Sequence, residues 1–153
     1  MIKLVDVYDE NMEVFSSTRF LYDLLKERDE ITNISHCKMP SFDEHLQFVY
    51  GRPYREWFLI YDEWGTVEMG PIGAIYLSKQ NEIGIFIAKE YQGKGHGKTA
   101  ICLLMNRHPG EQFLANINPH NSRSIDMFES LGFELKQLTF AKTTCASQKM
   151  GRK

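Results

Sequence analysis

The sequence predicts an α/β (α+β) fold in which helices flank a mixed, mostly antiparallel central sheet. Three observations predict it: strand-like and helix-like runs alternate, turn signals separate them, and no repeat or linker divides the 153 residues. A chain of this length favours one domain and can bury a core without disulfide or metal staples. We therefore expect a single domain over residues 1–153.

The first half of the chain predicts a strand, two helices and a second strand. Ile2 to Val7 has the composition of a strand, and Ser16 to Lys26 places apolar residues on one helix face. Ser41 and Glu44 have the spacing of a capping box, which predicts that a second helix begins there. The apolar run from Trp57 to Tyr61 is typical of a buried strand.

The second half alternates strands and helices at shorter intervals. Expected strands lie at 72–77, 82–87, 112–116 and 133–140, and expected helices begin at Lys98 and at Asn121 or Ser122. His108 to Gly110 stops the first of these helices, and Gly132 has the C′ position of the second. The predicted element order is therefore β-α-α-β-β-β-α-β-α-β.

Composition narrows the class of protein. Lys plus Arg is 18 and Asp plus Glu is 20, for a formal charge of −2, which argues against a nucleic-acid-binding or membrane-binding protein. No apolar run approaches the roughly 20 residues that span a bilayer, and the charged N-terminus does not resemble a signal peptide. Cys37, Cys102 and Cys145 are widely spaced, as in reduced cytoplasmic proteins. No His, Cys, Asp or Glu cluster has metal-ligand spacing, so we expect no metal. We also expect the protein to be a monomer or a homodimer.

The glycine-rich run from Gln92 to Thr99 is the strongest local feature. It reads Gln-Gly-Lys-Gly-His-Gly-Lys-Thr between an expected strand and an expected helix. Glycines let backbone N–H groups approach a ligand, and a helix N-terminus adds partial positive charge, so the run predicts a seat for a pyrophosphate. A P-loop would need glycine at Gln92, and a dinucleotide fingerprint would need glycine at His96, so neither pattern fits.

Two motifs together resemble a known family. Residues 87–97, Ile-Ala-Lys-Glu-Tyr-Gln-Gly-Lys-Gly-His-Gly, resemble the acetyl-CoA motif of the Gcn5-related N-acetyltransferases, whose core is Gln/Arg-x-x-Gly-x-Gly/Ala. Asn118 to Ser124, followed by Phe128 to Phe133, is similar to the family's second motif, Asn-x-x-Ser ending in Leu-Gly-Phe. The resemblance extends over about Ile72 to Phe140, and over the N-terminal half through element order alone.

This resemblance implies that acetyl-CoA binds at three parts of the chain. Strand backbone groups would bond the pantetheine arm, with an N–H near Ile87 polarising the thioester carbonyl. Loop amides would hold the pyrophosphate, and the second motif would contact the rest of the cofactor. The cofactor residues so implied are Phe86, Ile87, Ala88, Gln92, Gly93, Lys94, Gly95, His96, Gly97, Lys98, Thr99, Asn121, Ser124 and Phe128.

Phe128 departs from the family pattern. Many members carry tyrosine at this position, and its phenol is thought to protonate the leaving thiolate. Phenylalanine has no proton to give. The coenzyme A thiol is acidic enough that we expect a water molecule to suffice.

The acceptor is less constrained by the sequence. In the resembling family it is selected by the first helices and their loop, here residues 29–54, which include His36 and His45. This region loosely resembles members that acetylate nucleotide-linked amino sugars, and also members that acetylate protein N-termini. The leading expectation is direct transfer to a primary amine of a small molecule, with an amino sugar as acceptor. Other amine acceptors, a non-catalytic CoA-binding module and a nucleotide-phosphate enzyme remain alternatives.

Two residues are candidates for the catalytic base. An amine with a pKa near 10 must lose a proton before it attacks a thioester. Glu82 begins the strand that leads into the glycine loop, and strand alternation puts it on one face with Gly84 and Phe86. His36, in the acceptor-side loop, is the alternative base. A surface charge at a strand end is an equally good interpretation of Glu82.

Overall fold

The computed structural model describes residues 1–29, 38–62 and 70–142. Four strands form one sheet in the order β1-β2-β3-β4, and each neighbouring pair is antiparallel. The strands are β1 (Ile2–Asp6), β2 (Glu56–Asp62), β3 (Gly73–Leu77) and β4 (Ile83–Ile87). The expected mostly antiparallel sheet is confirmed, and β4 forms one of its edges.

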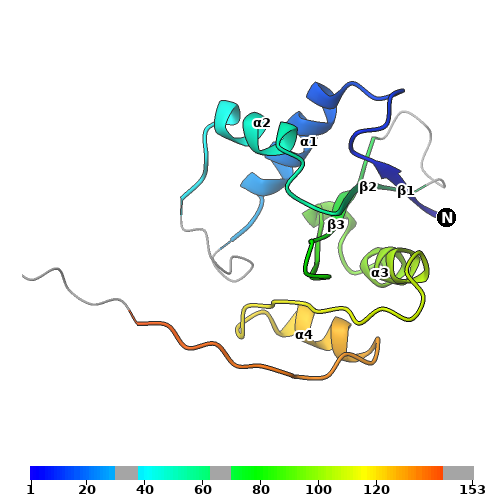
Figure 1. Cartoon of the computed structure of the whole chain (residues 1–153), viewed down its shortest axis with the longest axis vertical. Helices are drawn as coiled ribbons and strands as arrows, with labels where there is room; N and C mark the ends of the chain where they lie inside the picture. Colours follow the sequence, from blue (N-terminus) through cyan, green and yellow to red (C-terminus); the bar gives the residue numbers. More distant parts are fainter. Residues whose placement is uncertain (30–37, 63–69, 143–153) are drawn as a thin grey trace, which may run out of the picture.

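Helices cover both faces of this sheet. They are α1 (Val14–Lys26), α2 (Phe42–Tyr50), α3 (His96–Asn106) and α4 (Ser122–Glu129), with a short 3-10 helix, η2, at Lys89–Tyr91. Figure 1 shows the sheet between two layers, with α1 and α2 on one side and α3 and α4 on the other. Each expected helix is present, with its ends shifted by a few residues.

The two faces of the sheet have different cores. Under α3 and α4 the buried side chains are largely aliphatic, and include Ile60, Ile75, Leu77, Ile101 and Leu104. Under α1 and α2 the buried set includes Val49, Trp57, Leu59 and Phe86, and the tyrosines Tyr54, Tyr61 and Tyr76 pack against it. The second face is therefore rich in aromatic rings.

Local signals in the sequence set several helix ends. Ser41 Oγ accepts a hydrogen bond from Glu44 N–H at 3.2 Å, and Glu44 Oε2 accepts one from Ser41 N–H at 2.7 Å, so the predicted capping box is confirmed. After α4, Gly132 has a φ of 86°. The Phe133 N–H donates to the Phe128 carbonyl at 3.1 Å. Together these make a Schellman end, as the glycine predicted.

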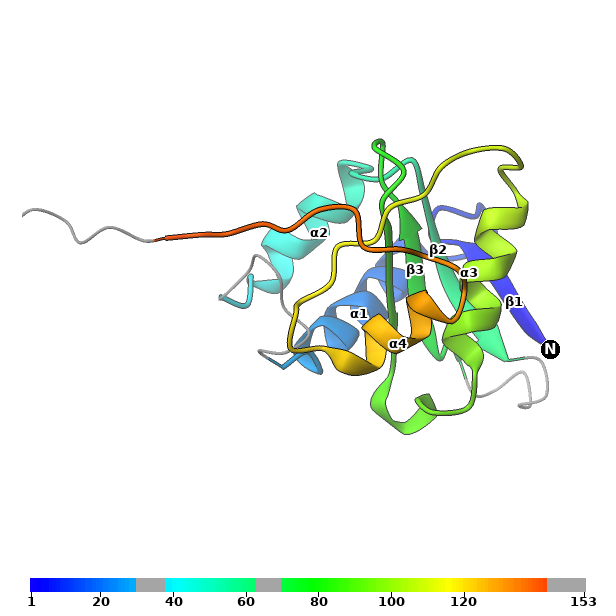
Figure 2. The ribbon, with the colours of Figure 1, turned by 90° about the horizontal axis from the view of Figure 1, so that it is seen from below.

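Two expected strands are not formed. Residues 112–116 make only an isolated parallel bridge, between Glu82 and Leu114. Residues 133–140 have no regular secondary structure. A strand needs a neighbour to hydrogen-bond with, and this segment runs past α4 and away from the sheet, leaving Leu135 78% and Phe140 91% exposed (Figures 1 and 2). Its pattern predicted a strand, and that prediction is wrong.

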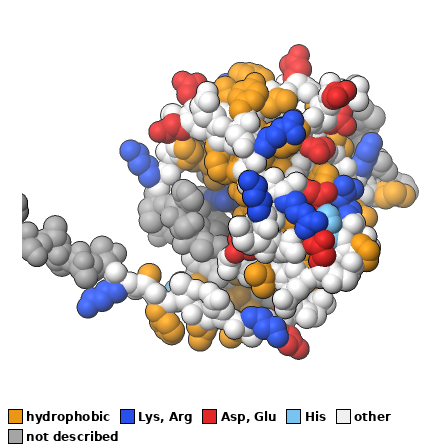
Figure 3. All heavy atoms as spheres, in the orientation of Figure 1, with side chains coloured by type: hydrophobic (Ala, Val, Ile, Leu, Met, Phe, Trp, Pro, Cys, Tyr) orange, Lys and Arg blue, Asp and Glu red, His pale blue; other side chains and the backbone are white. Residues whose placement is uncertain are grey.

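The surface carries both signs of charge. Figure 3 shows acidic and basic side chains interspersed over the face seen there. Among the described residues, no helix is long and apolar enough to cross a membrane.

Candidate active site

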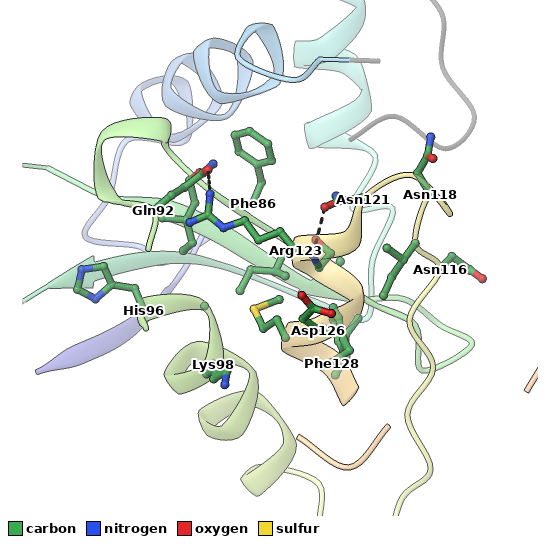
Figure 4. A pocket seen from close by; sticks show the side chains of 18 of the residues that line it. Phe86, Gln92, His96, Lys98, Asn116, Asn118, Asn121, Arg123, Asp126 and Phe128 are labelled. Atoms are coloured by element: carbon green, nitrogen blue, oxygen red, sulfur yellow. Dashed lines mark hydrogen bonds between the residues drawn. The ribbon is translucent and has the colours of Figure 1, made fainter. Parts of the chain in front are cut away.

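A cavity of about 630 Å³ lies between β4, the N-terminal end of α3, and α4 (Figure 4). Its lining includes these predicted site residues: Glu82, Phe86, Ile87, Gln92, Gly93, Gly95, His96, Gly97, Lys98, Asn121, Ser124 and Phe128. Ala88, Lys94 and Thr99 do not line it. His36 lies outside the residues that the structure describes. One cavity thus brings together both motifs and one of the two candidate bases.

The cavity opens where a segment parts from the edge of the sheet. Ile83 N–H donates to the Leu114 carbonyl at 2.8 Å, which joins the segment after α3 to the start of β4. Farther along, Asn116, Ile117 and Asn118 line the wall opposite β4. The segment after α3 therefore separates from β4 after a single bridge. Beyond Ile83, the free edge of β4 borders the cavity and not a fifth strand.

The peptide groups of Phe86 and Ala88, which were predicted to bind the cofactor, face β3 and not the cavity. Ala88 N–H donates to the Ile72 carbonyl at 2.9 Å, so this amide is used inside the sheet. Phe86 pairs with Ala74 of β3. Its peptide groups point toward β3, as those of Ala88 do, because alternate residues of a strand face the same edge. The prediction that the Phe86 and Ala88 amides hold a pantetheine arm is therefore wrong. Phe86 borders the cavity through its side chain.

The other peptide groups of β4 face the cavity. Ile83 bonds to Leu114 across the free edge, and strand alternation orients Ile85 and Ile87 toward that same edge. The Ile87 carbonyl accepts a hydrogen bond from Gln92 Nε2 at 2.7 Å. The Ile85 groups and the Ile87 N–H are thus the backbone groups that this strand presents to a ligand.

The glycine loop has the conformation of a phosphate seat. Gly93 and Gly95 have φ angles of 81° and 82°, in the left-handed region that favours glycine. Gly95 is the N-cap of α3, so the amides of His96, Gly97 and Lys98 have no carbonyl in the preceding turn to bond. These amides and the helix dipole make a partly positive, donor-rich end that suits an anion.

The first and last amides of the predicted loop are used within the chain. Gln92 N–H donates to the Lys89 carbonyl at 3.3 Å, and Thr99 N–H donates to the Gly95 carbonyl at 3.3 Å. These two amides are therefore already engaged within the chain. The donor-rich part is the shorter run 93–98.

Arginine 123 is a cation that the sequence reasoning missed. Its Nη1 donates to Gln92 Oε1 at 2.8 Å, which ties α4 to the loop (Figure 4). Lys98 also lines the cavity, whereas the Lys94 ammonium lies 5.4 Å from the centre of the Tyr91 ring and outside the lining. The available signal was the place of Arg123 inside the second motif, between its asparagine and its serine.

Helix α4 can lie close to the first turn of α3 because Gly97 has no side chain there. A β-carbon at Gly97 would lie 3.1 Å from Met127 Sδ, closer than most side-chain contacts. Asn121 Oδ1 accepts a hydrogen bond from Ser124 N–H at 3.1 Å and caps α4 (Figure 4). Phe128 is buried, and its ring packs edge-on against Phe133 with centroids 5.0 Å apart. Asn121 thus shapes the helix, and Phe128 belongs both to the cavity wall and to the core.

Two more charged side chains line the cavity, one near each end of β4. Glu82 Oε1 accepts a hydrogen bond from Asn116 Nδ2 at 2.8 Å, and both residues line the cavity. The Arg28 guanidinium lies 5.4 Å from the centre of the Phe86 ring and also lines it. Arg28 follows α1, so it approaches the cavity from the layer of α1 and α2.

His45, named in the acceptor region, is buried and does not line the cavity. Its ring centre lies 5.6 Å from that of Tyr22 and 6.4 Å from that of Phe48. Burial, with a smaller contribution from the nearby Arg28 charge, lowers the pKa of His45. It is a neutral group of the aromatic core.

Cysteine and metal chemistry have little support in the described ranges. Cys102 is half-buried in α3 and does not line the cavity, while Cys37 and Cys145 lie outside the described residues. Within residues 1–29, 38–62 and 70–142, no three His, Cys, Asp or Glu side chains are grouped so that they could hold a metal ion.

Several solved structures of other proteins share this fold. A phosphinothricin acetyltransferase from Sinorhizobium meliloti, in complex with acetyl-CoA, is 26% identical over 89% of this chain and 76% of that one, with a TM-score of 0.66. A spermidine N-acetyltransferase from Vibrio cholerae, in complex with CoA and spermine, is 20% identical over 89% and 82%, with a TM-score of 0.71. A domain from Methanocaldococcus jannaschii is 24% identical over 90% of both chains, with a TM-score of 0.66. No curated protein sequence gives a significant match.

The family comparison covers most of the chain. Residues 18–133 match the model of the acetyltransferase (GNAT) family, a range that begins inside α1 and ends just after α4. The match includes the glycine loop and the second motif, so the resemblance drawn from those residues is confirmed at the level of the family. The chain belongs to the GNAT family of acetyltransferases, whose acetyl donor is acetyl-CoA.

Proposed function

We propose that this enzyme moves an acetyl group from acetyl-CoA directly to a primary amine of a small molecule, with both substrates bound together. The observation that carries the proposal is the single cavity that joins the free edge of β4 to the donor-rich end of α3. Its size lies within the roughly 300–1,000 Å³ usual for small-molecule sites.

Different groups of the cavity suit different parts of the cofactor. The amides of the run 93–98, with the charges of Lys98 and Arg123, suit the two phosphates. The Ile85 groups and the Ile87 N–H suit the amide-rich pantetheine arm, because they are strand-edge donors and acceptors. Bound acetyl-CoA supplies an activated thioester, and the Ile87 N–H would polarise its carbonyl.

The base that we assign is Glu82. It shares the cavity with the β4 edge, and the hydrogen bond from Asn116 holds its carboxylate in place. A carboxylate there can accept the amine proton through a water molecule and pass it to solvent. His36 is kept as the alternative base. We propose direct transfer because Cys102, the cysteine in the described part of the chain, lies off the cavity.

We propose an amino sugar, linked to a nucleotide, as the first acceptor to test. Its support is the resemblance of the segment around Asp43 to Leu46 to enzymes of that class. The named neighbours act on phosphinothricin and spermidine, which are also small primary amines. A protein N-terminus is the second acceptor class that the same segment resembles.

The test is thiol release from acetyl-CoA in the presence of four acceptors. These are a nucleotide-linked amino sugar, spermidine, phosphinothricin and a short peptide with a free N-terminus. We expect one of the three small amines to accelerate release far above the rate with water alone. Acceleration by the peptide alone would replace the small-molecule proposal.

A binding measurement separates the remaining alternatives. Calorimetry with CoA and with ATP should show tight binding of CoA alone. CoA binding without any amine-stimulated release would favour a non-catalytic CoA-binding module, and binding of ATP in preference to CoA would favour a nucleotide-phosphate enzyme.

A further inference from the structure

Among the side chains that line the cavity without a role in the scheme above, one lies across the backbone of β4. It is Tyr76 of β3, and it brings a phenol to a site where Phe128 brings none. We propose that the Tyr76 hydroxyl gives its proton to the sulfur of coenzyme A when the acetyl group leaves. The inference rests on the proposed acetyl transfer.

The first argument is the place of the ring. Tyr76 pairs with Gly84 across β3 and β4, and a β-carbon at Gly84 would collide with Cζ, Cε1 and the hydroxyl oxygen of Tyr76. The ring therefore lies flat over the backbone of Gly84. Since neighbouring strands are roughly 4.8 Å apart, a tyrosine lying across one strand carries its hydroxyl to the strand that borders the cavity.

The second argument is that the ring is held on both sides. Tyr54 stacks on Tyr76 with centroids 3.8 Å apart and planes 6° from parallel, and Tyr54 itself packs against Trp57 at 4.9 Å. Burial, together with the neighbouring Tyr76, raises the pKa of Tyr54, so that phenol stays neutral. A ring fixed between Gly84 and Tyr54 has its hydroxyl positioned before substrate arrives, which is what proton transfer requires.

The third argument is the neighbouring proton acceptor. Glu82 precedes Gly84 by two residues, so the two residues share one face of β4, and Glu82 and Tyr76 both line the cavity. The phenol and the carboxylate therefore lie on the side of the strand that faces α1 and α2.

The proton balance closes with these two groups. The acceptor arrives as an ammonium group, and Glu82 first passes one of its protons to solvent, as proposed above. The neutral nitrogen then forms its bond to the acetyl carbon, the carbon–sulfur bond breaks, and Tyr76 gives its proton to the sulfur. The new acetylated nitrogen carries one proton too many. That proton returns to the Tyr76 oxygen, through Glu82 and water, and leaves an amide, a thiol and an unchanged enzyme.

The main test is Tyr76→Phe, which removes the hydroxyl and keeps the ring over Gly84. We expect kcat to fall about 100-fold, within the range for loss of a general acid, while KM for acetyl-CoA changes less than about threefold. The basic limb of the kcat–pH profile should also disappear. The matched control is Tyr61→Phe, a half-buried tyrosine of β2 on the aromatic face and outside the cavity lining, which should leave kcat and its pH profile unchanged.

A rescue variant separates chemistry from packing. Phe128→Tyr, added to Tyr76→Phe, places a phenol on the opposite wall of the cavity. If the missing function is a proton for the sulfur, the double variant should recover at least about tenfold of the lost kcat. A merely structural role of Tyr76 would not be restored from α4.

A binding experiment reads the same contact without turnover. A phenol that donates to sulfur favours the thiolate, so CoA should release protons on binding, and calorimetry in two buffers of different ionisation enthalpy counts them. We expect less proton release with Tyr76→Phe than with the unaltered enzyme, and no difference between the two proteins with desulfo-CoA, which keeps the titrating phosphate but lacks the sulfur.

An unchanged kcat profile together with unchanged proton release in Tyr76→Phe would overturn the inference and leave the proposed function standing. If the unaltered enzyme does not bind CoA, the proposed function fails, and this inference fails with it.

Discussion

The two faces of the sheet build their halves of the site by different means. On the face covered by α3 and α4, the core is largely aliphatic, and the groups that we propose for the cofactor are mostly backbone amides, placed by Gly93 and Gly95. On the face covered by α1 and α2, the core is rich in aromatic rings, and the functional groups that we propose are the side chains of Tyr76 and Glu82. Main-chain recognition persists through most substitutions, whereas side-chain recognition changes with one. The difference predicts a constant donor end and a variable acceptor end.

Blocking the backbone end should have the largest effect. Gly95→Val puts a branched side chain on a residue with φ of 82°, where an added β-carbon has no protein neighbour within 4 Å and enters the open space at the N-terminal end of α3. We expect at least about a 100-fold loss of CoA affinity by calorimetry, as several hydrogen bonds to a charged group are lost.

The matched control for this prediction is Gly110→Val. Gly110 has a φ of 83° and also meets no protein atom, but it lies in the turn after α3. Both variants should lose similar stability through strain, and only the first should lose CoA affinity. Equal affinities would contradict the assignment of the loop as the phosphate seat.

On the side-chain face, Glu82→Gln should act on rate and not on cofactor binding. Glutamine keeps the shape and can still bond Asn116, but it cannot take a proton at neutral pH. We expect kcat to fall about tenfold or more and the acidic limb of its pH profile to disappear, with CoA affinity unchanged. Glu129→Gln, an exposed acid of α4, should change neither. A full rate with an unshifted profile would exclude Glu82 and favour His36.

The contrast between the faces also explains what the sequence could predict. The glycine loop, the capping box at Ser41 and the Schellman glycine at 132 are local, because each depends on neighbours within a few residues. The pairing of Tyr76 with Gly84 is not local, since it depends on the register of two strands. The sequence alone did not indicate this register, so the contact of Tyr76 with Gly84 was not predicted.

Two wrong predictions have the same origin. The sequence showed which residues belong to β4, but the direction of each peptide group depends on which neighbour lies on which edge, and so Phe86 and Ala88 were assigned to the wrong side. The pattern of residues 133–140 satisfies strand propensity, yet a strand also needs an edge to pair with, and the segment leads away from the sheet.

A smaller effect distinguishes two of the cations near the loop, Arg123 and Lys94. Arg123→Gln and Lys94→Gln remove the same charge, but Arg123 bonds to Gln92 at the cavity, while Lys94 lies over Tyr91. We expect Arg123→Gln to weaken CoA binding by about tenfold at low salt, and less at high salt, because charge-assisted contacts at the surface are screened. Lys94→Gln should weaken it by no more than about twofold. The reverse order would show that the sequence-based choice of Lys94 was right.

The last prediction concerns stability and leaves the site untouched. Burial, and then the Arg28 charge, lower the pKa of His45 in the folded protein, and its Nε2 finds no hydrogen-bond partner among the described residues. Near pH 6.5 the unfolded chain therefore binds more of this proton than the folded protein does. Stability should rise with pH through this range and be lost as pH falls below it.

His45→Phe keeps an aromatic ring between Tyr22 and Phe48 and removes the titration. Between about pH 5 and pH 7, the urea midpoint of the variant should therefore vary less than that of the unaltered protein, with CoA affinity the same in both. The carboxyl groups whose pKa is lowered, those of Glu44, Glu56 and Glu111, lose their stabilising effect only at more acidic pH, so they do not mask the difference. Equal pH dependence in the two proteins would mean that the imidazole is protonated in the folded state, and hence that water reaches the aromatic face beneath α2.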